Sequence, residues 1–504
     1  MFTYKANSIN LPNPAKLLDS LRSTGYDNYN ALADIIDNSL DADANKVIID
    51  IYQEKGDFKI IIADDGKGMD LHVLDEALKL GSETDKDYQS DLGRFGMGLS
   101  TASLSMCRRT EIITKDKSGK LLKSVTDLDW VKESNEFKKY LGEVDNDDID
   151  LFNSYLKNSE SGTIVIFSKS DRIQNTNTTV FTNTLKKHVA RIFRRFLEAG
   201  KVIIINKEKV QPFDPLILND SNTRVYSDEE YEIKIQKGDK YYEDTIRIKF
   251  VIVPNYGYSG NRDKGINYQN QGFYVMRNQR ELFAGSNLDG IYTKDAHLNR
   301  FRAEIYFSGS LDDLMGVHFT KRSISIDQAL HDKIKEYSRG QITEIQKIAD
   351  SERPKSEKVV SHSNSEKLIS KKSKLLVKPP AEEEPKRETD GKKNKKEPDS
   401  KDRKRDFVER LRLICKFEER SMEKVGPLYA PSMEGKKVII TWNSDHPFYK
   451  LIVERKEDKT FVTALDFLIF SFASAELKSV NDENVSLLEG IRQYMSQNLR
   501  VLVD

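Results

Sequence analysis

The chain has 504 residues, enough for several domains, and its 81 basic and 81 acidic side chains cancel, so its overall charge favours no class of partner. Cys107 and Cys415 are its two cysteines, which excludes a disulfide framework and is typical of a reducing cytosol. The start lacks the apolar core of a signal peptide, and the apolar run 461–475 contains Asp466 and is shorter than the ~20 residues that span a bilayer. We therefore expect a cytoplasmic protein with no membrane partner.

Hydrophobic patterning divides the chain into four parts. In residues 1–180, helical patterns alternate with short β-branched runs, which predicts an α/β layer. Residues 181–345 predict a second α+β unit that opens with an amphipathic helix. Residues 351–405 hold five prolines and 18 lysines or arginines against 11 acidic residues, so they predict a disordered linker with a local charge of +7. Residues 406–504 resume a hydrophobic pattern and predict a small α/β domain.

The segment 30–51 predicts a helix followed by a strand, and the helix carries an unusual polar face. Asp34, Asn38 and Asp41 are spaced i, i+4 and i+7, so they share one face, opposite an apolar stripe. Carboxylates and amides are poor residues for a helix interior because they compete for backbone groups. A solvated helix face explains such a triplet when it stands alone.

Two glycine motifs follow this helix. Asp64, Gly66 and Gly68 form D-x-G-x-G directly after a predicted strand, where bare backbone can approach a ligand. Gly93, Gly96 and Gly98 then open a predicted helix, whose backbone amides suit an anion such as phosphate. The order G-x-x-G-x-G differs from the dinucleotide fingerprint, and a G-x-x-x-x-G-K-[ST] loop is absent. An ordinary turn would explain D-x-G-x-G alone equally well.

Together with Thr163 at the head of the run 162–168, these motifs occur in the order found in the GHKL ATPases, the family of DNA gyrase B, the heat-shock chaperone, histidine kinases and MutL. The chain resembles the MORC branch and its prokaryotic relatives in particular, through "STGYDNYNALADIIDNSLDADA", "LGRFGMGLSTASLSMCRR" and "GFYVMRNQREL". This resemblance implies an α+β protein. Its parts would be a GHKL α/β sandwich (Bergerat type) at 1–180, a transducer-like, S5-type domain at 181–345, the linker and the C-terminal domain.

The resemblance also implies roles for individual residues. Asn38 would coordinate Mg²⁺ at the phosphates of ATP, since Mg²⁺ prefers hard oxygen ligands. Asp64 would accept a hydrogen bond from the adenine amino group, near Thr163, and Met69 would pack on the base or merely fill the core. Three glycines would lie at the triphosphate, with residues 79–92 as a mobile lid: Gly93, Gly96 and Gly98.

Two residues would serve the reaction itself. The position four before the Mg²⁺ asparagine carries a glutamate base in the family, and here it is Asp34, one methylene shorter. Lys321, in "GVHFTKRSIS", would be the transducer cation at the γ-phosphate, although the adjacent Arg322 competes for that role. Arg277 and Asn278 match the MORC-like pattern, and a β-turn explains them too. Asp41 and Asp37 are expected to hold the helix in place.

The implied function is an ATP-gated dimeric clamp, or conformational switch, that hydrolyses ATP slowly and acts in DNA handling or prokaryotic genome defence. The alternative is a nucleotide-binding scaffold that assembles partners with little turnover. A two-component kinase is disfavoured because no phosphoacceptor histidine lies in a recognisable helical box. For the C-terminal domain we expect docking of a partner protein or dimerisation.

Overall fold

The computed structural model describes residues 13–503 except for 23–26, 80–90, 93–97, 268, 293, 295–297, 318–325, 352–358, 373–413, 423, 425, 435–436 and 479–481. The chain forms two compact units, one of residues 1–251, 273–289 and 302–337, the other of residues 252–272, 290–301 and 338–504. The boundaries expected from the sequence, at 180, 345 and 405, differ from this division.

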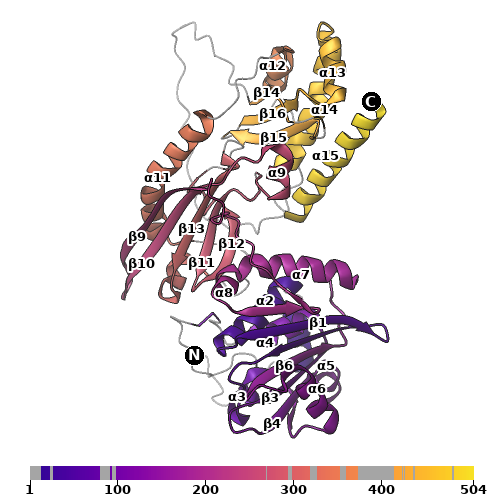
Figure 1. Cartoon of the computed structure of the whole chain (residues 1–504), viewed down its shortest axis with the longest axis vertical. Helices are drawn as coiled ribbons and strands as arrows, with labels where there is room; N and C mark the ends of the chain where they lie inside the picture. Colours follow the sequence, from indigo (N-terminus) through magenta and orange to yellow (C-terminus); the bar gives the residue numbers. More distant parts are fainter. Residues whose placement is uncertain are drawn as a thin grey trace, which may run out of the picture. The chain divides into compact units, whose positions relative to one another are not determined.

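The first unit contains an eight-stranded sheet in the order β5-β4-β3-β6-β2-β1-β7-β8 (Figure 1). Neighbouring strands are antiparallel except β1 and β7, which are parallel. Its strands are β1 (Lys46–Glu54), β2 (Asp57–Asp64), β3 (Arg109–Lys115), β4 (Leu121–Asp127), β5 (Tyr140–Gly142), β6 (Gly162–Ser168), β7 (Val202–Ile205) and β8 (Glu208–Lys209). The alternation of helices with β-branched strands predicted for residues 1–180 is thereby confirmed, since such runs form β1, β2, β3 and β6.

Alternating residues of the central strands face two different helical layers. Val47, Ile49, Phe58 and Ile60 belong to one core with side chains of α2, α4 and α7, whereas Ile61 lies on the other face, with side chains of α6. The helices of this part are α1 (Pro14–Arg22), α2 (Asn28–Asp41), α3 (Leu71–Ala77), α4 (Gly98–Met106), α5 (Leu128–Ser134), α6 (Asn146–Leu156), α7 (Thr178–Ile192) and α8 (Arg194–Glu198). The predicted α/β sandwich is confirmed.

A second sheet has the strand order β12-β11-β13-β10-β9. Its strands are β9 (Arg224–Lys237), β10 (Lys240–Ile252), β11 (Gly272–Arg277), β12 (Arg280–Ser286) and β13 (Phe301–Phe307). Between and after these strands along the chain come the helical elements α9 (Gly257–Asp263), η2 (Gly309–Leu311), α10 (Asp312–Met315) and α11 (Gln328–Ser351). The hydrophobic runs 245–253, 271–278 and 300–309 correspond to β10, β11 and β13. The α+β character expected for this part is confirmed.

The C-terminal part has a three-stranded sheet in the order β14-β16-β15, with β14 parallel and β15 antiparallel to β16. It comprises α12 (Ser363–Lys372), β14 (Cys415–Arg420), β15 (Tyr429–Glu434), β16 (Lys437–Asn443), α13 (Pro447–Glu454), α14 (Lys459–Lys478) and α15 (Asp482–Val503). Helix α12 lies inside the range expected to be linker. Val360 and Ile369 are buried in the same core as Phe417 and Trp442, so residues 359–372 are part of this domain.

Helix α14 includes the apolar run singled out in the sequence. Among the described residues, Lys459–Leu477 is the one helical stretch long and apolar enough to cross a membrane, and a third of it is buried in the protein. Its Asp466 is fully buried and accepts hydrogen bonds from Ser365 and from the Nδ1 of His362, 2.9 Å away. These contacts give the Asp466 carboxylate polar partners inside the C-terminal core.

Candidate functional site

Helix α2 packs most of its length against the core. Asp27 caps its first turn by accepting from the Asn30 amide, 3.1 Å away. Residues 31–40 are all buried except Asn38, which is half-buried. No hydrogen bond between the described residues engages the Asn38 side chain, so its amide oxygen retains capacity for a ligand.

Asp64 ends β2 as a buried carboxylate with two partners from different segments. One oxygen accepts from the Gly66 amide at 3.0 Å and the other from the Ser39 hydroxyl at 2.9 Å. Burial raises the pKa of Asp64 to about 6, and hydrogen bonding with Gly66, Ser39 and the Thr163 backbone offsets this rise only in part. Each oxygen has a further lone pair, so the carboxylate can accept one more donor and would gain from it.

The two glycines of the D-x-G-x-G motif are required by the packing of their own loop. A Cβ on Gly68 would lie 2.0 Å from the Lys115 carbonyl oxygen, and its φ of +69° is rarely adopted by other residues. A Cβ on Gly66 would lie 2.7 Å from the Ala42 carbonyl oxygen. The bare backbone therefore serves contacts inside the protein, in addition to any approach of a ligand.

Thr163 lies directly beside Asp64, because the two residues pair across β6 and β2. The Thr163 hydroxyl is 3.0 Å from that of Thr114, which accepts from the Met69 amide at 2.9 Å. The half-buried Met69 side chain packs against a cluster that includes Leu74. The alternative that Met69 fills the core therefore has a structural basis.

Gly98 begins α4 and lies against the polar face of α2. A Cβ built on Gly98 would be 3.8 Å from the Asp34 Cβ and 4.0 Å from the Asn38 Nδ2. The last glycine of G-x-x-G-x-G and two of the three polar residues of α2 thus meet. Asp64 is tied to the same helix through Ser39, so two predicted site residues lie on α2 and two more border it.

Asp34 and Asp37 share a partner that the sequence did not reveal. Arg280, in β12, places its Nε 2.9 Å from one Asp37 oxygen and 3.0 Å from the other, and its Nη2 3.4 Å from Asp34 Oδ1. The three side chains are buried.

His188 is also held against α2. It lies 3.2 Å from the Asn30 amide oxygen, and burial lowers the pKa of His188 to about 3.

The end of the expected lid is held on two sides. Asp41 accepts from the Leu92 amide at 2.8 Å, which is the structural hydrogen-bonding role expected for it. Arg277 donates to the Asp91 carbonyl oxygen at 2.7 Å and forms a two-pronged pair with Asp312, at 2.7 and 2.9 Å. The second sheet therefore contacts the segment that leads into the glycine loop.

Three of the predicted site residues, Gly93, Gly96 and Lys321, lie outside the described residues, as do Arg94, Arg322 and residues 80–90 of the lid. Within the part of the chain that the structure describes, no group of three His, Cys, Asp or Glu side chains gathers to hold a metal ion. A metal at this site would accordingly depend on Asn38 together with oxygen atoms of a ligand.

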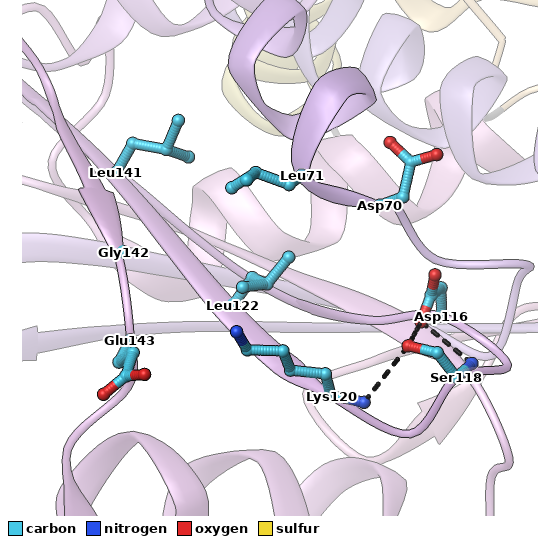
Figure 2. A pocket seen from close by; sticks show the side chains of 9 residues that line it. All are labelled: Asp70, Leu71, Asp116, Ser118, Lys120, Leu122, Leu141, Gly142 and Glu143. Atoms are coloured by element: carbon cyan, nitrogen blue, oxygen red, sulfur yellow. Dashed lines mark hydrogen bonds between the residues drawn. The ribbon is translucent and has the colours of Figure 1, made fainter.

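A cavity of about 350 Å³ lies near the loop that follows the D-x-G-x-G motif (Figure 2). Three of its residues are acidic, which is the wrong sign for a phosphate group. It is lined by Asp70, Leu71, Asp116, Ser118, Lys120, Leu122, Leu141, Gly142 and Glu143. Because none of these is a predicted site residue, the cavity is distinct from the site bordered by α2.

Comparison with known proteins agrees with this geometry. Residues 26–163 match the family model of the histidine kinase-, DNA gyrase B- and HSP90-like ATPases. The chain is 34% identical over 96 residues to the ATPase MORC2B of Mus musculus and 33% identical over 93 residues to the ATPase MORC2 of Homo sapiens. These segments cover 18% and 17% of this chain and 9% of each relative, so the likeness concerns one part of much longer proteins.

Proposed function

Since residues 26–163 form a GHKL ATPase domain that is similar to that of the MORC ATPases, we propose that this chain binds Mg²⁺–ATP beside α2 and hydrolyses it slowly, as a conformational switch. The observation that carries the proposal is the convergence on α2. Ser39 bonds Asp64, and Gly98 lies against Asp34 and Asn38. A single helix would thereby connect the base-binding and phosphate-binding ends of the nucleotide.

Asp64 is proposed to bind the adenine amino group. Its support is the spare acceptor capacity of a buried carboxylate whose two present partners do not fully compensate its burial. Thr163, beside it in the sheet, would contribute to the same end of the site, with the backbone of Gly66 and Gly68 close to the nucleotide and Met69 packed on the base.

Asn38 is proposed to hold Mg²⁺, which supplies positive charge to the phosphates when it is bound. Asn38 suits that role because it is half-buried, lies beside Gly98 and is the one residue of 31–40 that is not buried. The α4 amino terminus would receive phosphate oxygens at Gly98, with Gly93 and Gly96 preceding it along the chain. Lys321 remains a proposal from the sequence for the γ-phosphate.

Asp34 is proposed to orient and deprotonate the attacking water. Its carboxylate lies on the face of α2 that meets Gly98. Relative to glutamate it reaches about 1 Å less far, and a misplacement of that size costs on the order of 10²-fold in rate, so turnover should be slow. The switch would then depend on ATP binding the closed conformation more tightly than the open one, and not on fast hydrolysis.

The wider assignment rests on likeness to the family. The clamp would be a homodimer formed on ATP binding, acting on DNA in DNA handling or prokaryotic genome defence, in the cytoplasm. The C-terminal domain would dock a partner protein. Each of these statements is a proposal that goes beyond the matched segment.

Steady-state hydrolysis by the full chain tests the role of Asp34. Asp34→Ala should lower turnover at least tenfold while a non-hydrolysable ATP analogue still binds, because the base is lost and the nucleotide contacts remain. Asp34→Glu should equal or exceed the parent. If Asp34→Ala hydrolyses ATP as fast as the parent, Asp34 is not the base.

The scaffold alternative has one observation in its favour. Asp34 already contacts Arg280, so its carboxylate has a structural partner that requires no catalytic role. A scaffold would bind ATP with the same affinity in the parent and in Asp34→Ala, with equally negligible turnover in both. Measurable turnover that depends on Asp34 decides for the ATPase.

A further inference from the structure

Two buried arginines flank a two-residue turn of the second sheet. Arg277 ends β11 and Arg280 begins β12, and they are direct partners across the hairpin. The residues between them, Asn278 and Gln279, have φ values of +47° and +71°, as in the two-residue turns that match strand twist. The spacing R-N-Q-R thus puts both guanidinium groups at one hairpin tip.

Arg280 is bound unequally by the two carboxylates of α2. The Arg280 and Asp37 side chains are 3% and 2% exposed, and both Asp37 oxygens lie within 3.0 Å of the Arg280 Nε. The Asp34 side chain is 10% exposed, and one of its oxygens lies 3.4 Å from Nη2. Asp37 therefore anchors the guanidinium, and Arg280 holds Asp34 through a longer contact.

Arg280 compensates the negative charges of two neighbouring carboxylates on α2. Asp34 and Asp37 lie one turn apart, and two buried negative charges at that spacing repel one another. A guanidinium between them compensates both, and it has enough donors to serve two carboxylates at once.

The other charged groups near Arg280 are already engaged. Its Nη1 donates to the Glu281 backbone oxygen at 3.2 Å, while the Glu281 carboxylate is bound by Arg194. Arg277, across the turn, is fixed by Asp312. The hairpin tip is thereby held in place, and Arg280 is directed at α2.

Resting on the proposed function, we propose that Arg280 is a positioning residue for Asp34. Anchored by Asp37, it fixes the orientation of the short Asp34 carboxylate and compensates its charge. The second sheet thus supplies a group that the hydrolysis site needs. A shift of the hairpin tip would release Asp34, which offers a physical route by which the state of this sheet controls turnover.

The test is a set of full-length variants assayed for turnover, for affinity toward a non-hydrolysable ATP analogue, and for thermal unfolding. Arg280→Gln should lower kcat on the order of tenfold to 10²-fold, as loss of orientation does, with the analogue affinity unchanged. Arg280→Lys, which keeps the charge, should recover part of the loss. Arg247→Gln is the matched control, because Arg247 pairs with Asp228 on the exposed surface of the same sheet, 2.7 Å away.

A double-mutant cycle shows whether Arg280 acts through Asp34. In an Asp34→Asn background, Arg280→Gln should lower turnover no further. If Arg280→Gln leaves Asp37 uncompensated and fails to fold, Arg280→Gln combined with Asp37→Asn removes both charges and should show the same fall in kcat.

Three results separate the claims. Parent-like kcat in Arg280→Gln, or a fall that adds fully to that of Asp34→Asn, overturns the positioning role of Arg280. A fall in kcat that the Arg247→Gln control reproduces also overturns it, because a general weakening of the sheet would then be the cause. Parent-like turnover in Asp34→Asn alone contradicts the proposed function instead.

Discussion

Replacing Asp64 by asparagine should strengthen the fold and weaken nucleotide binding at the same time. The asparagine oxygen can still accept from the Gly66 amide, and its NH₂ group can donate to the Ser39 hydroxyl, so both present contacts have an equivalent. What changes is the charge, together with the acceptor that is proposed to face the adenine amino group.

The size of the stability effect follows from the pKa of Asp64, which burial raises from 3.8 to about 6. A carboxyl group whose pKa is higher in the folded state does not lower the free energy of unfolding below pH 3.8. Between pH 3.8 and pH 6 the free energy of unfolding falls progressively, because the folded state must release a proton that it binds more tightly than the unfolded state does. At pH 7 the cost is about 3 kcal/mol, at 1.36 kcal/mol per pKa unit. Asp64→Asn should therefore unfold at a higher temperature at pH 7 and show little difference from the parent near pH 4.

The binding effect should have the opposite sign. Loss of a charged acceptor costs ~1.5–3 kcal/mol, so the affinity for ATP should fall at least tenfold. Calorimetric titration at pH 7 measures this, and comparing parent and variant between pH 5 and pH 7 cancels the titration of the phosphates themselves. Parent-like affinity in a folded Asp64→Asn protein would refute the adenine assignment. An unchanged melting temperature at pH 7 would refute the claim that the negative charge of Asp64 destabilises the folded state.

Three further predictions concern other parts of the protein. Burial lowers the pKa of His188 from 6.5 to about 3, so on acidification this side chain takes up a proton in the unfolded chain before it does so in the folded protein. Lowering the pH from 7 to 5 should therefore reduce the free energy of unfolding by about 2 kcal/mol. Denaturation of His188→Gln should lack that part of the loss, and an equal loss in both proteins would contradict the reasoning. Arg277→Gln should release the end of the lid from the second sheet, speeding dissociation of a fluorescent ATP analogue in stopped flow, and an unchanged rate would contradict that. If the basic segment 392–396 contacts DNA, neutralising its four lysines should flatten the dependence of log K on log salt, whereas an unchanged slope rejects that contact.

Local patterns predicted the elements that position the site. The β-branched runs became β1, β2, β3 and β6, and the i, i+4, i+7 spacing correctly separated the apolar stripe of α2 from its polar face. The role of Asp41 as a structural acceptor is confirmed by its bond to Leu92. Such features are visible in sequence because they depend on residues a few positions apart.

Contacts between distant segments were not visible. Arg280 reaches Asp34 and Asp37 across about 245 positions of the chain, and the one signal in the sequence was the second arginine of R-N-Q-R. Residues 359–372 were predicted to be linker because their many lysines and serines make the segment polar on average, although Val360 and Ile369 are buried in the C-terminal core. Composition averages over a segment, whereas burial is decided residue by residue.

Equilibrium binding of ATP to the full chain, with and without Mg²⁺, tests the central claim most directly. The account predicts one ATP per chain, bound more tightly with Mg²⁺ than without it. Asn38→Ala should abolish that difference and leave binding without the metal nearly unchanged, because the proposed site has the Asn38 amide at the phosphates and Asp64 at the base. Failure of the parent to bind ATP, or a Mg²⁺ dependence that survives Asn38→Ala, would contradict the account.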